Sequence, residues 1–327
     1  MICKAPFNNM YFTVLGQVSP CWKLPGYCDQ WSHKRSIKDI WEGAQFQKYR
    51  YALSHNVFIN KCSDCQRDIE AGVWPLAKAY AEFPIQPYPS LMELELSNQC
   101  NLECTMCSGM LSSGIRKNRE GLPPLPQIYD EKFIEELKEF IPHLKELRFN
   151  GGEPFAQKIV LDICDVVAEL NPSLKINFAT NGTVYNKRVE HILDKCNIHL
   201  NISIDSLIPE RYEAIRINGK FDVLMENFAK FRKYCHDNDR WICVMVNPMN
   251  NNWDEMVEFV EWCDVQNVFL HYNTILYPRH LTIKDLPKDE ILKIHSHLTK
   301  EFDDLPKHIV NYDKIENLLK HIRSWAE

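Results

Sequence analysis

The closest grouping of reactive side chains is Cys100-Asn-Leu-Glu-Cys104-Thr-Met-Cys107, in which three thiols fall within eight residues. Thiolates at this spacing on one loop can converge on a single metal centre. They are one short of the closed four-ligand set of a structural zinc site. They suit a four-iron cluster in which the protein holds three irons and the fourth stays open to another ligand. An open iron indicates catalysis, because a purely structural site would be closed.

A second set of cysteines precedes this loop. Four thiols belong to it: Cys3, Cys21, Cys62 and Cys65. Gly16 lies between the first two, and its freedom to form a tight turn permits Cys21 to fold back toward Cys3. Cys28 is a candidate substitute ligand. The remaining cysteines lack paired spacing and are interpreted as core residues: Cys164, Cys196, Cys235, Cys243 and Cys263.

Composition limits the other possibilities. The 327-residue chain has 13 cysteines and begins Met-Ile-Cys-Lys-Ala-Pro-Phe, without the charged and apolar regions of an export signal. Disulfides are rare in cytoplasmic proteins, so we expect reduced thiols and a cytoplasmic location. No apolar run approaches the ~20 residues of a membrane span, and the net charge of −6 gives no strongly basic surface. We therefore expect neither a membrane nor a nucleic acid as a partner.

The elements that must position these thiols alternate between strand and helix patterns. From residue 91 to about 273 we predict six strands: 92–96, 146–149, 175–179, 199–204, 241–246 and 268–272. Helical patterns accompany them at 102–115, 130–140, 157–170, 187–195, 221–236 and 254–263. Consecutive βα units imply parallel strands with right-handed crossovers, and hence an α/β sheet or barrel. The cysteine loop follows the first of these strands.

The two flanks differ from this central region. Residues 1–90 show little periodicity apart from a helical pattern at 36–53, and they end in a proline-rich linker at 83–90. Beyond residue 285 an apolar stripe at helical spacing predicts helices that pack on the central region. We therefore predict three parts: an N-terminal module at 1–90, a barrel domain at 91–284 and a helical extension at 285–327.

Polar residues alternate with apolar ones along three of the predicted strands. They are Glu93, Glu95, Arg148, Asn150, Asn201, Ser203 and Asp205. Such alternation places the polar residues on one face of each strand. In a barrel that face is the lumen, which would then be wet and hold a polar ligand. The alternative is an edge strand that exposes the same face to water.

The cysteine loop and the strand count together resemble the radical S-adenosylmethionine (SAM) superfamily, over about residues 91–275. That family has a C-x3-C-x2-C loop after the first strand of a partial (β/α)6 TIM-like barrel. The resemblance implies that Cys100, Cys104 and Cys107 hold a [4Fe-4S] cluster whose open iron chelates SAM. It also implies that SAM is cleaved reductively to methionine and a 5′-deoxyadenosyl radical, which removes a hydrogen atom from a substrate.

Other marks of that family follow the expected strands. Gly151-Gly152-Glu153-Pro154 looks like the family's GGEP segment, which holds the amino group of SAM. Ser203 and Asp205 lie where the family contacts the ribose and carboxylate, and Arg216 lies where an arginine approaches the carboxylate. Three further SAM contacts are predicted by the same resemblance, of which the first and last are expected near the adenine: Met106, Asn181 and Tyr272.

The N-terminal cysteines resemble the twitch form of the SPASM auxiliary-cluster module, which holds one additional [4Fe-4S] cluster. In most of the family this module follows the barrel, whereas here it precedes it. The resemblance implies that the second set of cysteines binds this auxiliary cluster: Cys3, Cys21, Cys62 and Cys65. A zinc knuckle built from the same four thiolates is the alternative.

These resemblances imply an enzyme that receives electrons from a flavodoxin or ferredoxin. Relatives with auxiliary clusters oxidise sugar-like alcohols or modify peptides. A module that begins at residue 3 leaves no room for a preceding leader-binding domain, which favours a polar sugar- or amino-alcohol-like small molecule, met by Glu93, Glu95 and Asp205. We expect net oxidation through the auxiliary cluster. The alternatives are a peptide-modifying maturase and a non-catalytic iron–sulfur electron carrier, although a carrier needs no GGEP segment.

Overall fold

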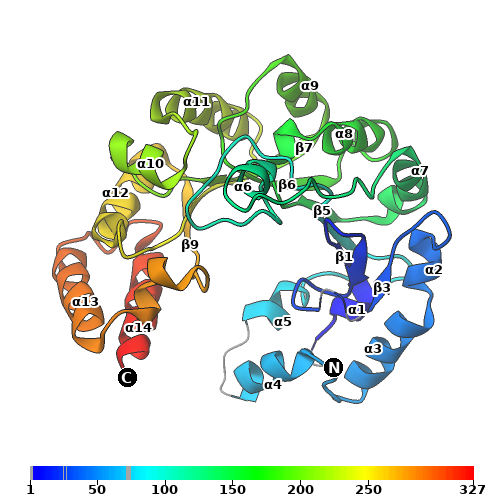
Figure 1. Cartoon of the computed structure of the whole chain (residues 1–327), viewed down its shortest axis with the longest axis horizontal. Helices are drawn as coiled ribbons and strands as arrows, with labels where there is room; N and C mark the ends of the chain where they lie inside the picture. The colour runs from blue at the N-terminus through cyan, green and yellow to red at the C-terminus, as the bar shows by residue number, and fades with distance from the viewer. Residues whose placement is uncertain (1–2, 25, 27, 71–74) are drawn as a thin grey trace. The chain divides into compact units, whose positions relative to one another are not determined.

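The computed structural model describes residues 3–24, 26, 28–70 and 75–327, and the chain divides into two compact units (Figure 1). The first unit comprises residues 1–100, 120–179 and 186–198. The second unit comprises residues 101–119, 180–185 and 199–327. The N-terminal cysteines and the GGEP segment therefore belong to the first unit, and Cys104 and Cys107 belong to the second.

A sheet in the order β3-β2-β1-β4-β5-β6 forms the centre of the first unit. Its strands are β1 (Asn9–Phe12), β2 (Gln17–Ser19), β3 (Asp29–Gln30), β4 (Leu91–Leu94), β5 (Glu146–Phe149) and β6 (Lys175–Thr180). β4, β5 and β6 run parallel, as predicted. β1 pairs parallel with β4 and antiparallel with β2. The N-terminal residues thus extend the sheet that carries the cysteine loop, which the sequence did not indicate.

The turn between β1 and β2 depends on Gly16. This residue has a φ of +80°, and a Cβ there would lie 2.9 Å from Cγ2 of Ile128. The N–H of Gly16 donates to the carbonyl of Thr13 at 2.9 Å, and its own carbonyl accepts from Trp31 at 2.8 Å. The predicted tight turn is therefore present, and only glycine combines this φ with the available space.

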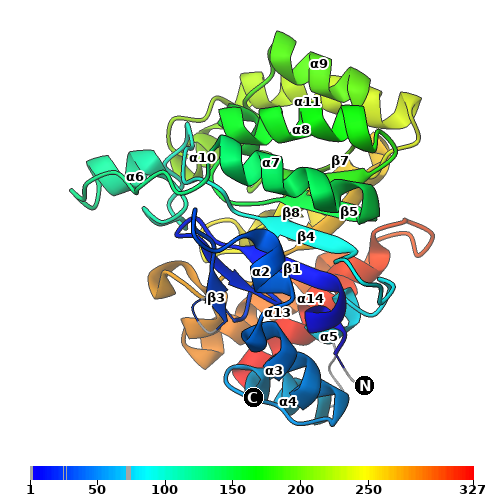
Figure 2. The same ribbon diagram turned by 90° about the vertical axis from the view of Figure 1, so that its right-hand side faces the viewer.

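Helices cover the sheet of the first unit. They are α1 (Ala5–Asn8), α2 (Ile37–Trp41), α3 (Ala44–Ser54), α4 (Cys62–Glu70), α5 (Pro75–Ala79), α7 (Glu131–Phe140), α8 (Lys158–Leu170) and α9 (Lys187–Lys195). Figure 2 shows α7, α8 and α9 side by side as a layer, and α8 contacts both of the others. The single helix predicted at 36–53 is divided at Gly43, whose extended backbone caps α3.

The second unit contains three parallel strands in the order β7-β8-β9. They are β7 (Asn197–Ser203), which enters this unit at residue 199, β8 (Ile242–Val246) and β9 (Phe269–Tyr272). Its helices are α6 (Ser113–Asn118), α10 (Pro209–Ile215), α11 (Phe221–Asp237), α12 (Met256–Gln266), α13 (Lys288–Asp303) and α14 (Tyr312–Ala326). Short 3-10 turns occur in both units: Ile141–His143, Pro154–Ala156, Trp253–Glu255, Arg279–Leu281 and Ile283–Asp285.

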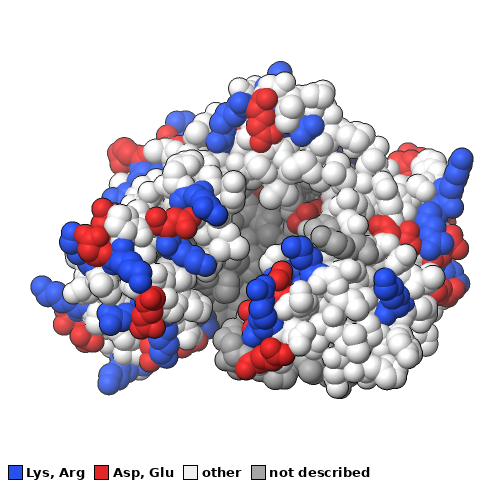
Figure 3. All heavy atoms as spheres, turned by 60° about the horizontal axis from the view of Figure 1, so that its bottom comes forward, with Lys and Arg blue, Asp and Glu red and all other residues white. Residues whose placement is uncertain are grey.

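The C-terminal helices pack against the strands of their own unit. α14 contacts α12, α13 and β9. The buried Asn311, just before α14, accepts from the N–H of Leu270 at 2.8 Å and donates to the carbonyl of Val268 at 2.9 Å. The amide thereby satisfies backbone groups of the last strand. On the face shown in Figure 3, acidic and basic side chains are interspersed. Among the described residues, no helix has the length and apolarity to cross a bilayer.

The helix predicted at 102–115 is wrong, because only Ser113–Asn118 is helical there. Residues of the cysteine loop instead bond to the chain around the end of α10. The N–H of Glu103 donates to the carbonyl of Ile217, and the N–H of Thr105 donates to that of Ile215, both at 2.9 Å. A helix would need these N–H groups for its own backbone bonds.

Candidate functional site

The cysteine loop is fixed by contacts within the second unit. Besides the two bonds to the α10 segment, the guanidinium of Arg119 donates to the carbonyl of Cys104 at 2.8 Å. Ser112 donates its hydroxyl to the carbonyl of Leu102 at 2.7 Å and also caps the start of α6. The N–H of Cys107 donates to the carbonyl of Cys104 at 3.1 Å, which forms a turn between these two cysteines. The loop therefore presents its thiols from a defined backbone.

Burial controls the ionisation of these thiols. Cys104 is buried, and burial raises its pKa although the nearby guanidinium of Arg216 acts in the opposite direction. Burial also raises the pKa of Cys107, to about 11, with a further contribution from Cys104. Both side chains are neutral thiols at neutral pH in the metal-free protein. Binding of iron must displace their protons, because only the thiolate is a metal ligand.

Arg216 is the charged group that contacts the cysteine loop. Its Nη2 lies 2.7 Å from Oδ2 of Asp205, and its Nη1 lies 3.9 Å from Sγ of Cys104. Both residues of this ion pair are buried. Burial works against the charge on Arg216, but Asp205 and the thiol of Cys104 raise its pKa above the ordinary value for arginine. The structure thus brings together three residues that the sequence analysis singled out separately.

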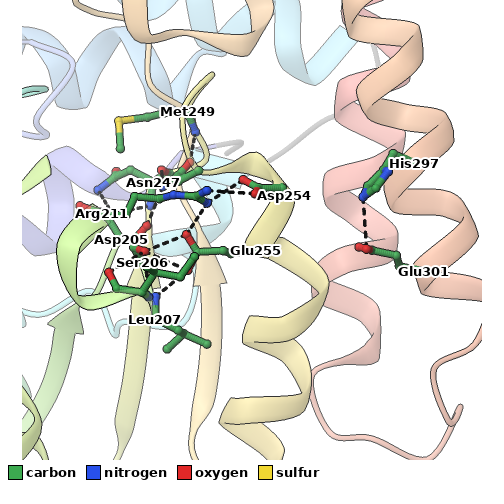
Figure 4. Close-up of polar contacts among 12 residues, drawn as sticks. Asp205, Ser206, Leu207, Arg211, Asn247, Met249, Asp254, Glu255, His297 and Glu301 are labelled. Carbon is green, nitrogen blue, oxygen red and sulfur yellow. Dashed lines mark hydrogen bonds and ion pairs between the residues drawn. The ribbon is translucent and has the colours of Figure 1, made fainter. Parts of the chain in front are cut away.

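Asp205 is clamped by the segment that follows β8 (Figure 4). Oδ1 of Asp205 accepts from the backbone N–H of Asn247 at 2.8 Å and from its Nδ2 at 2.9 Å. The carbonyl of Asp205 accepts from Nδ2 of Asn252 at 2.7 Å, and Oδ1 of Asn252 accepts from the N–H of Met249 at 2.6 Å. These asparagines fix the side chain and the backbone of Asp205 together. The sequence analysis missed both, although the asparagine-rich run after a predicted strand was a usable signal.

Glu255 supports the next residue along the chain, also visible in Figure 4. It is almost fully buried and accepts from the hydroxyl of Ser206 at 2.7 Å and from the N–H of Leu207 at 2.7 Å. Nη1 of Arg211 lies 2.7 Å from Oε1 of Glu255 and 2.7 Å from Oδ1 of Asp254, so Arg211 balances the charge of Glu255. A buried carboxylate with this many partners holds the backbone that follows Asp205 in one conformation.

The GGEP segment lies in the first unit and has a backbone conformation that favours glycine. Gly151 has a φ of +76° and Gly152 a φ of +56°. A Cβ on Gly152 would lie 2.4 Å from the carbonyl oxygen of Gln99 and 2.7 Å from Nε2 of Gln157. Gln157 itself donates to the carbonyl of Gly151 at 2.9 Å. Only glycine fits this position, and a backbone free of side chains is what close approach of a ligand requires.

The last two residues of this segment are fully enclosed. Glu153 is buried, its N–H donates to the carbonyl of Gln99 at 2.8 Å, and its carboxylate accepts from the N–H of Phe155 at 3.1 Å. Pro154 begins the 3-10 turn that leads to α8. These contacts hold the glycines against the chain that leads into the cysteine loop.

The remaining predicted SAM contacts of the second unit have different surroundings. Met106 packs against an apolar cluster that includes Ile215 and Met249. Asn181 donates to Oδ1 of Asn101 at 3.0 Å, in the cysteine loop. Ser203 is half-buried at the end of β7. Tyr272 donates its hydroxyl to the carbonyl of Met256, so this group is engaged within the protein.

The second set of cysteines meets in the first unit. Four thiols line one small, apolar cavity: Cys3, Cys21, Cys62 and Cys65. Cys28 does not line this cavity. It packs against the apolar cluster that surrounds Cys21 and includes Tyr49 and Tyr80. Burial is the main cause of a raised pKa in every one of these thiols, to about 12 for Cys62 and for Cys28. Neighbouring thiols raise the pKa of Cys62 further.

The chemistry of the thiols, rather than a preformed ligand set, agrees with the cofactors implied by the sequence. The thirteen cysteines, all of which lie among the described residues, form no disulfide bond. Among the described residues, no three His, Cys, Asp or Glu side chains converge as ligands of a single metal ion. Three buried polar atoms around the cysteine loop lack a protein partner: Oγ1 of Thr105, the hydroxyl of Tyr212 and Nε of Arg216. Buried polar groups normally have partners, so these atoms agree with a polar group bound beside the loop.

The polar face of β4 differs from expectation at Glu93. Oε1 of Glu93 accepts from Nδ2 of Asn9 at 2.7 Å and from the hydroxyl of Tyr80 at 2.8 Å. Its Oε2 lies 3.6 Å from Nη1 of Arg148. Both oxygens thus have partners within the first unit. Glu95 is less enclosed, and burial raises its pKa although a hydrogen bond from Tyr11 acts in the opposite direction.

Comparisons with known proteins agree with this assembly. The model of the radical SAM superfamily matches residues 94–263. A second model, SPASM, described as an iron–sulfur cluster-binding domain, matches residues 3–66. The N-terminal cysteines lie within the matched iron–sulfur module, which favours an iron–sulfur cluster over the zinc alternative.

Curated relatives match about half of this chain. The mitochondrial GTP 3′,8-cyclase of Arabidopsis thaliana is 28% identical over 173 residues, which are 52% of this chain and 42% of the relative. Molybdenum cofactor biosynthesis protein 1 of Homo sapiens is 27% identical over 175 residues, 52% of this chain and 26% of the relative. The chain therefore spans about half or less of the length of these curated relatives.

A solved structure shares the fold. The structure of hexahistidine-tagged anSMEcpe with bound AdoMet is 19% identical, has a TM-score of 0.50, and covers 66% of this chain and 58% of its own. The predicted partial (β/α)6 barrel with an N-terminal SPASM-type module is thereby confirmed. SAM, its [4Fe-4S] cluster and an auxiliary iron–sulfur cluster are the cofactors of such a protein. The chain belongs to the radical SAM superfamily, as an enzyme that carries a SPASM iron–sulfur domain ahead of its barrel.

Proposed function

We propose that this enzyme oxidises a polar small molecule of the sugar- or amino-alcohol class, with Cys100, Cys104 and Cys107 as ligands of the SAM-binding cluster. When bound, that cluster and SAM supply a 5′-deoxyadenosyl radical that takes a hydrogen atom from carbon. Cys3, Cys21, Cys62 and Cys65 are proposed to hold the auxiliary cluster. A flavodoxin or ferredoxin is the proposed electron donor. The free thiols agree with a reducing compartment, and we propose the cytoplasm.

The chain's own residues would position SAM. Gly151 and Gly152, which have positive φ angles and no side chains, are proposed to let the amino group of SAM approach the backbone. Met106 offers an apolar surface suited to the adenine. Four residues keep their proposed roles from the family resemblance: Pro154, Asn181, Ser203 and Tyr272. Glu153 acts by holding the glycines, because its carboxylate is spent on the N–H of Phe155.

The position of Glu95 and its raised pKa are the observations that favour oxidation of an alcohol or amine. It follows β4 beside the GGEP segment, where a Cβ on Gly151 would lie 3.2 Å from its own Cβ. Its raised pKa suits a group that accepts a proton during the reaction. Oxidation of an alcohol to a carbonyl releases two electrons and two protons. Glu95 would take the hydroxyl proton. The SAM-derived radical would supply removal of one hydrogen atom, and a cluster held by Cys3, Cys21, Cys62 and Cys65 would supply an acceptor for the remaining electron.

The relatives give independent support for a small substrate. The matched GTP 3′,8-cyclases are named for a nucleotide. Modification of a peptide is the competing function, and it calls for the same radical chemistry. The nature of the substrate therefore has to be separated from the chemistry by experiment.

Fractionated cell extract provides that separation. The anaerobically reconstituted enzyme, with SAM and reductant, is given either the small-molecule fraction or the peptide fraction. We expect the small-molecule fraction to stimulate formation of 5′-deoxyadenosine, and protease treatment to leave the stimulation intact. Glu95→Gln should retain basal cleavage of SAM but lose the stimulated turnover. Stimulation by the peptide fraction alone, abolished by protease, would establish a maturase instead.

A further inference from the structure

Arg216 occupies a position that its predicted role as a ligand of the SAM carboxylate does not explain. Its side chain is 7% exposed. Nη2 is committed to Asp205 at 2.7 Å, and Nη1 is directed at Sγ of Cys104 at 3.9 Å. This is a hydrogen-bonding distance for sulfur. Two of the three nitrogens of the guanidinium therefore have partners within the second unit before any ligand is present.

The backbone around Arg216 leaves the side chain little choice of direction. Its N–H donates to the carbonyl of Tyr212 at 2.7 Å, at the end of α10. Its carbonyl accepts from the N–H of Gly219 at 2.7 Å, where a Cβ would lie only 2.8 Å from that oxygen. The main chain is thus fixed on both sides. The guanidinium is held at its far end by Asp205.

Asp205 can hold Arg216 because its own position is determined elsewhere. Oδ1 takes both hydrogen bonds from Asn247, and the carbonyl takes the one from Asn252 (Figure 4). Oδ2 is left to face Arg216. A chain of contacts therefore runs from Asn247, in the loop after β8, through Asp205 and Arg216 to the sulfur of Cys104. Each contact in it lies within the second unit.

We propose that Arg216 is a hydrogen-bond donor to the sulfur of Cys104 that raises the reduction potential of the SAM-binding cluster, and that Asp205 and Asn247 are its positioning residues. The proposal rests on the cluster assignment in the proposed function. It assigns to Arg216 a partner other than the SAM carboxylate.

The physical basis is the charge that the cluster gains on reduction. Hydrogen bonds to cluster sulfurs are among the factors that set the potential of iron–sulfur centres. The donor stabilises the more negative, reduced state more than the oxidised state. Low exposure strengthens the effect, because little water screens the charge. Asp205 cancels the long-range charge of Arg216 but leaves the N–H group aimed at sulfur.

The test is a potentiometric titration followed by electron paramagnetic resonance (EPR). Arg216→Met removes the donor but leaves Asp205 buried without its cation, so the double variant Asp205→Asn/Arg216→Met is measured beside it. This pair stays neutral and carries no N–H directed at Cys104. At a fixed potential we expect about a tenfold lower ratio of reduced to oxidised SAM cluster, about 59 mV for a one-electron couple. The SAM cluster is recognised as the signal that changes when SAM is added.

Lys220→Gln is the matched control. Lys220 forms an exposed ion pair with Glu213 of α10 at 2.7 Å. The variant removes one positive charge from the same segment without touching the cysteine loop. Its potential should equal that of the wild type. A wild-type potential in the double variant as well would overturn the proposal. If that variant also bound SAM more weakly, the result would support the original role of Arg216 as a ligand of the SAM carboxylate.

A measurement on the wild type does not depend on the folding of any variant. The protein is labelled with 15N-arginine, and the reduced SAM cluster is examined by pulsed EPR. A donor to the sulfur of Cys104 gives a 15N hyperfine coupling, and Arg216→Lys identifies it by its loss. Absence of any arginine coupling contradicts the inference. Absence of a SAM-responsive cluster signal altogether would instead contradict the proposed function.

Discussion

Burial affects the thiols of both cysteine sites, but the surroundings of the two sites differ in polarity. Cys104 lies on a loop held by backbone hydrogen bonds, with the Arg216 guanidinium directed at its sulfur. The cavity of the N-terminal cysteines lies among apolar side chains, including Leu24, Leu53 and Ala77. Burial raises the thiol pKa values in both sites. In the loop the guanidinium groups of Arg216 and Arg119 oppose this effect at Cys104 and Cys107, whereas in the cavity Lys23 opposes it at Cys65.

The difference indicates how each site depends on its metal. Hydrogen bonds to backbone carbonyls tie the loop around Cys104 to α6 and to the end of α10, and these bonds do not involve cysteine sulfur. The N-terminal cysteines are themselves part of a small apolar core with Tyr49 and Tyr80. We infer that the first site is organised before its cluster binds, whereas the cluster of the second contributes to folding its module.

The largest expected effect concerns the loop. Cys104→Ala should reduce formation of 5′-deoxyadenosine to background while leaving the circular dichroism spectrum close to that of the wild type. The matched control is Cys263→Ala, which removes another buried cysteine of the second unit, in α12. That variant should lose some stability but retain SAM cleavage. Unchanged cleavage in Cys104→Ala would refute the assignment of the catalytic cluster.

The next effect separates the two sites. Cys62→Ala/Cys65→Ala should abolish turnover of substrate but retain uncoupled cleavage of SAM, because the radical-generating residues are untouched. Hydrogen exchange should also become faster in residues 3–70, because Cys62 packs against the small apolar core of this module. SAM affinity serves as the check on the barrel. Product formation at the wild-type rate, with normal SAM binding, would show that the auxiliary cluster has no oxidative role.

A smaller effect tests the GGEP cradle. Gly152→Ala places a Cβ 2.4 Å from the carbonyl oxygen of Gln99, so the segment must shift. We expect SAM affinity to fall about tenfold, which corresponds to about 1.4 kcal/mol. Gly121→Ala is the control, since Gly121 also has a positive φ, +63°, but a Cβ there meets nothing within 4 Å. Equal SAM affinities in the two variants would show that the GGEP segment does not contribute to SAM binding.

The smallest effect is predicted for Cys28, which lies outside the cavity formed by its four neighbours. Cys28→Ser should bind as much iron as the wild type and lose less than about 1 kcal/mol of stability. Iron analysis and thermal unfolding measure the two quantities. Loss of about four iron atoms per chain would make Cys28 a ligand.

The sequence was sufficient where local signals agree with the final structure. The predicted helix at 187–195 is observed with the same bounds, because Asn186 caps it through bonds to the N–H groups of Arg188 and Val189. The six barrel strands were likewise found within about two residues at each end. The cysteine spacing was enough to suggest the family, because three ligands lie on one short loop.

Long-range contacts explain what the sequence could not show. Residues 102–112 have helix-compatible spacing, but the N–H groups of Glu103 and Thr105 donate to the α10 segment, at the carbonyls of residues 217 and 215, more than 100 residues away. β1 is a four-residue strand that is buried throughout, so it shows no alternation, and its partner β4 lies some 80 residues later. The clamp on Asp205 by Asn247 depends on two loops that meet only in the folded chain.

The central claim is that two distinct iron–sulfur sites divide the work. Iron content and EPR of the reconstituted wild type, Cys104→Ala and Cys62→Ala/Cys65→Ala test it together. We predict about eight iron atoms per chain in the wild type and about four in each variant. A signal that changes on addition of SAM should persist only in the wild type and the Cys62→Ala/Cys65→Ala variant. About four iron atoms in the wild type, all lost from Cys104→Ala, would contradict the account.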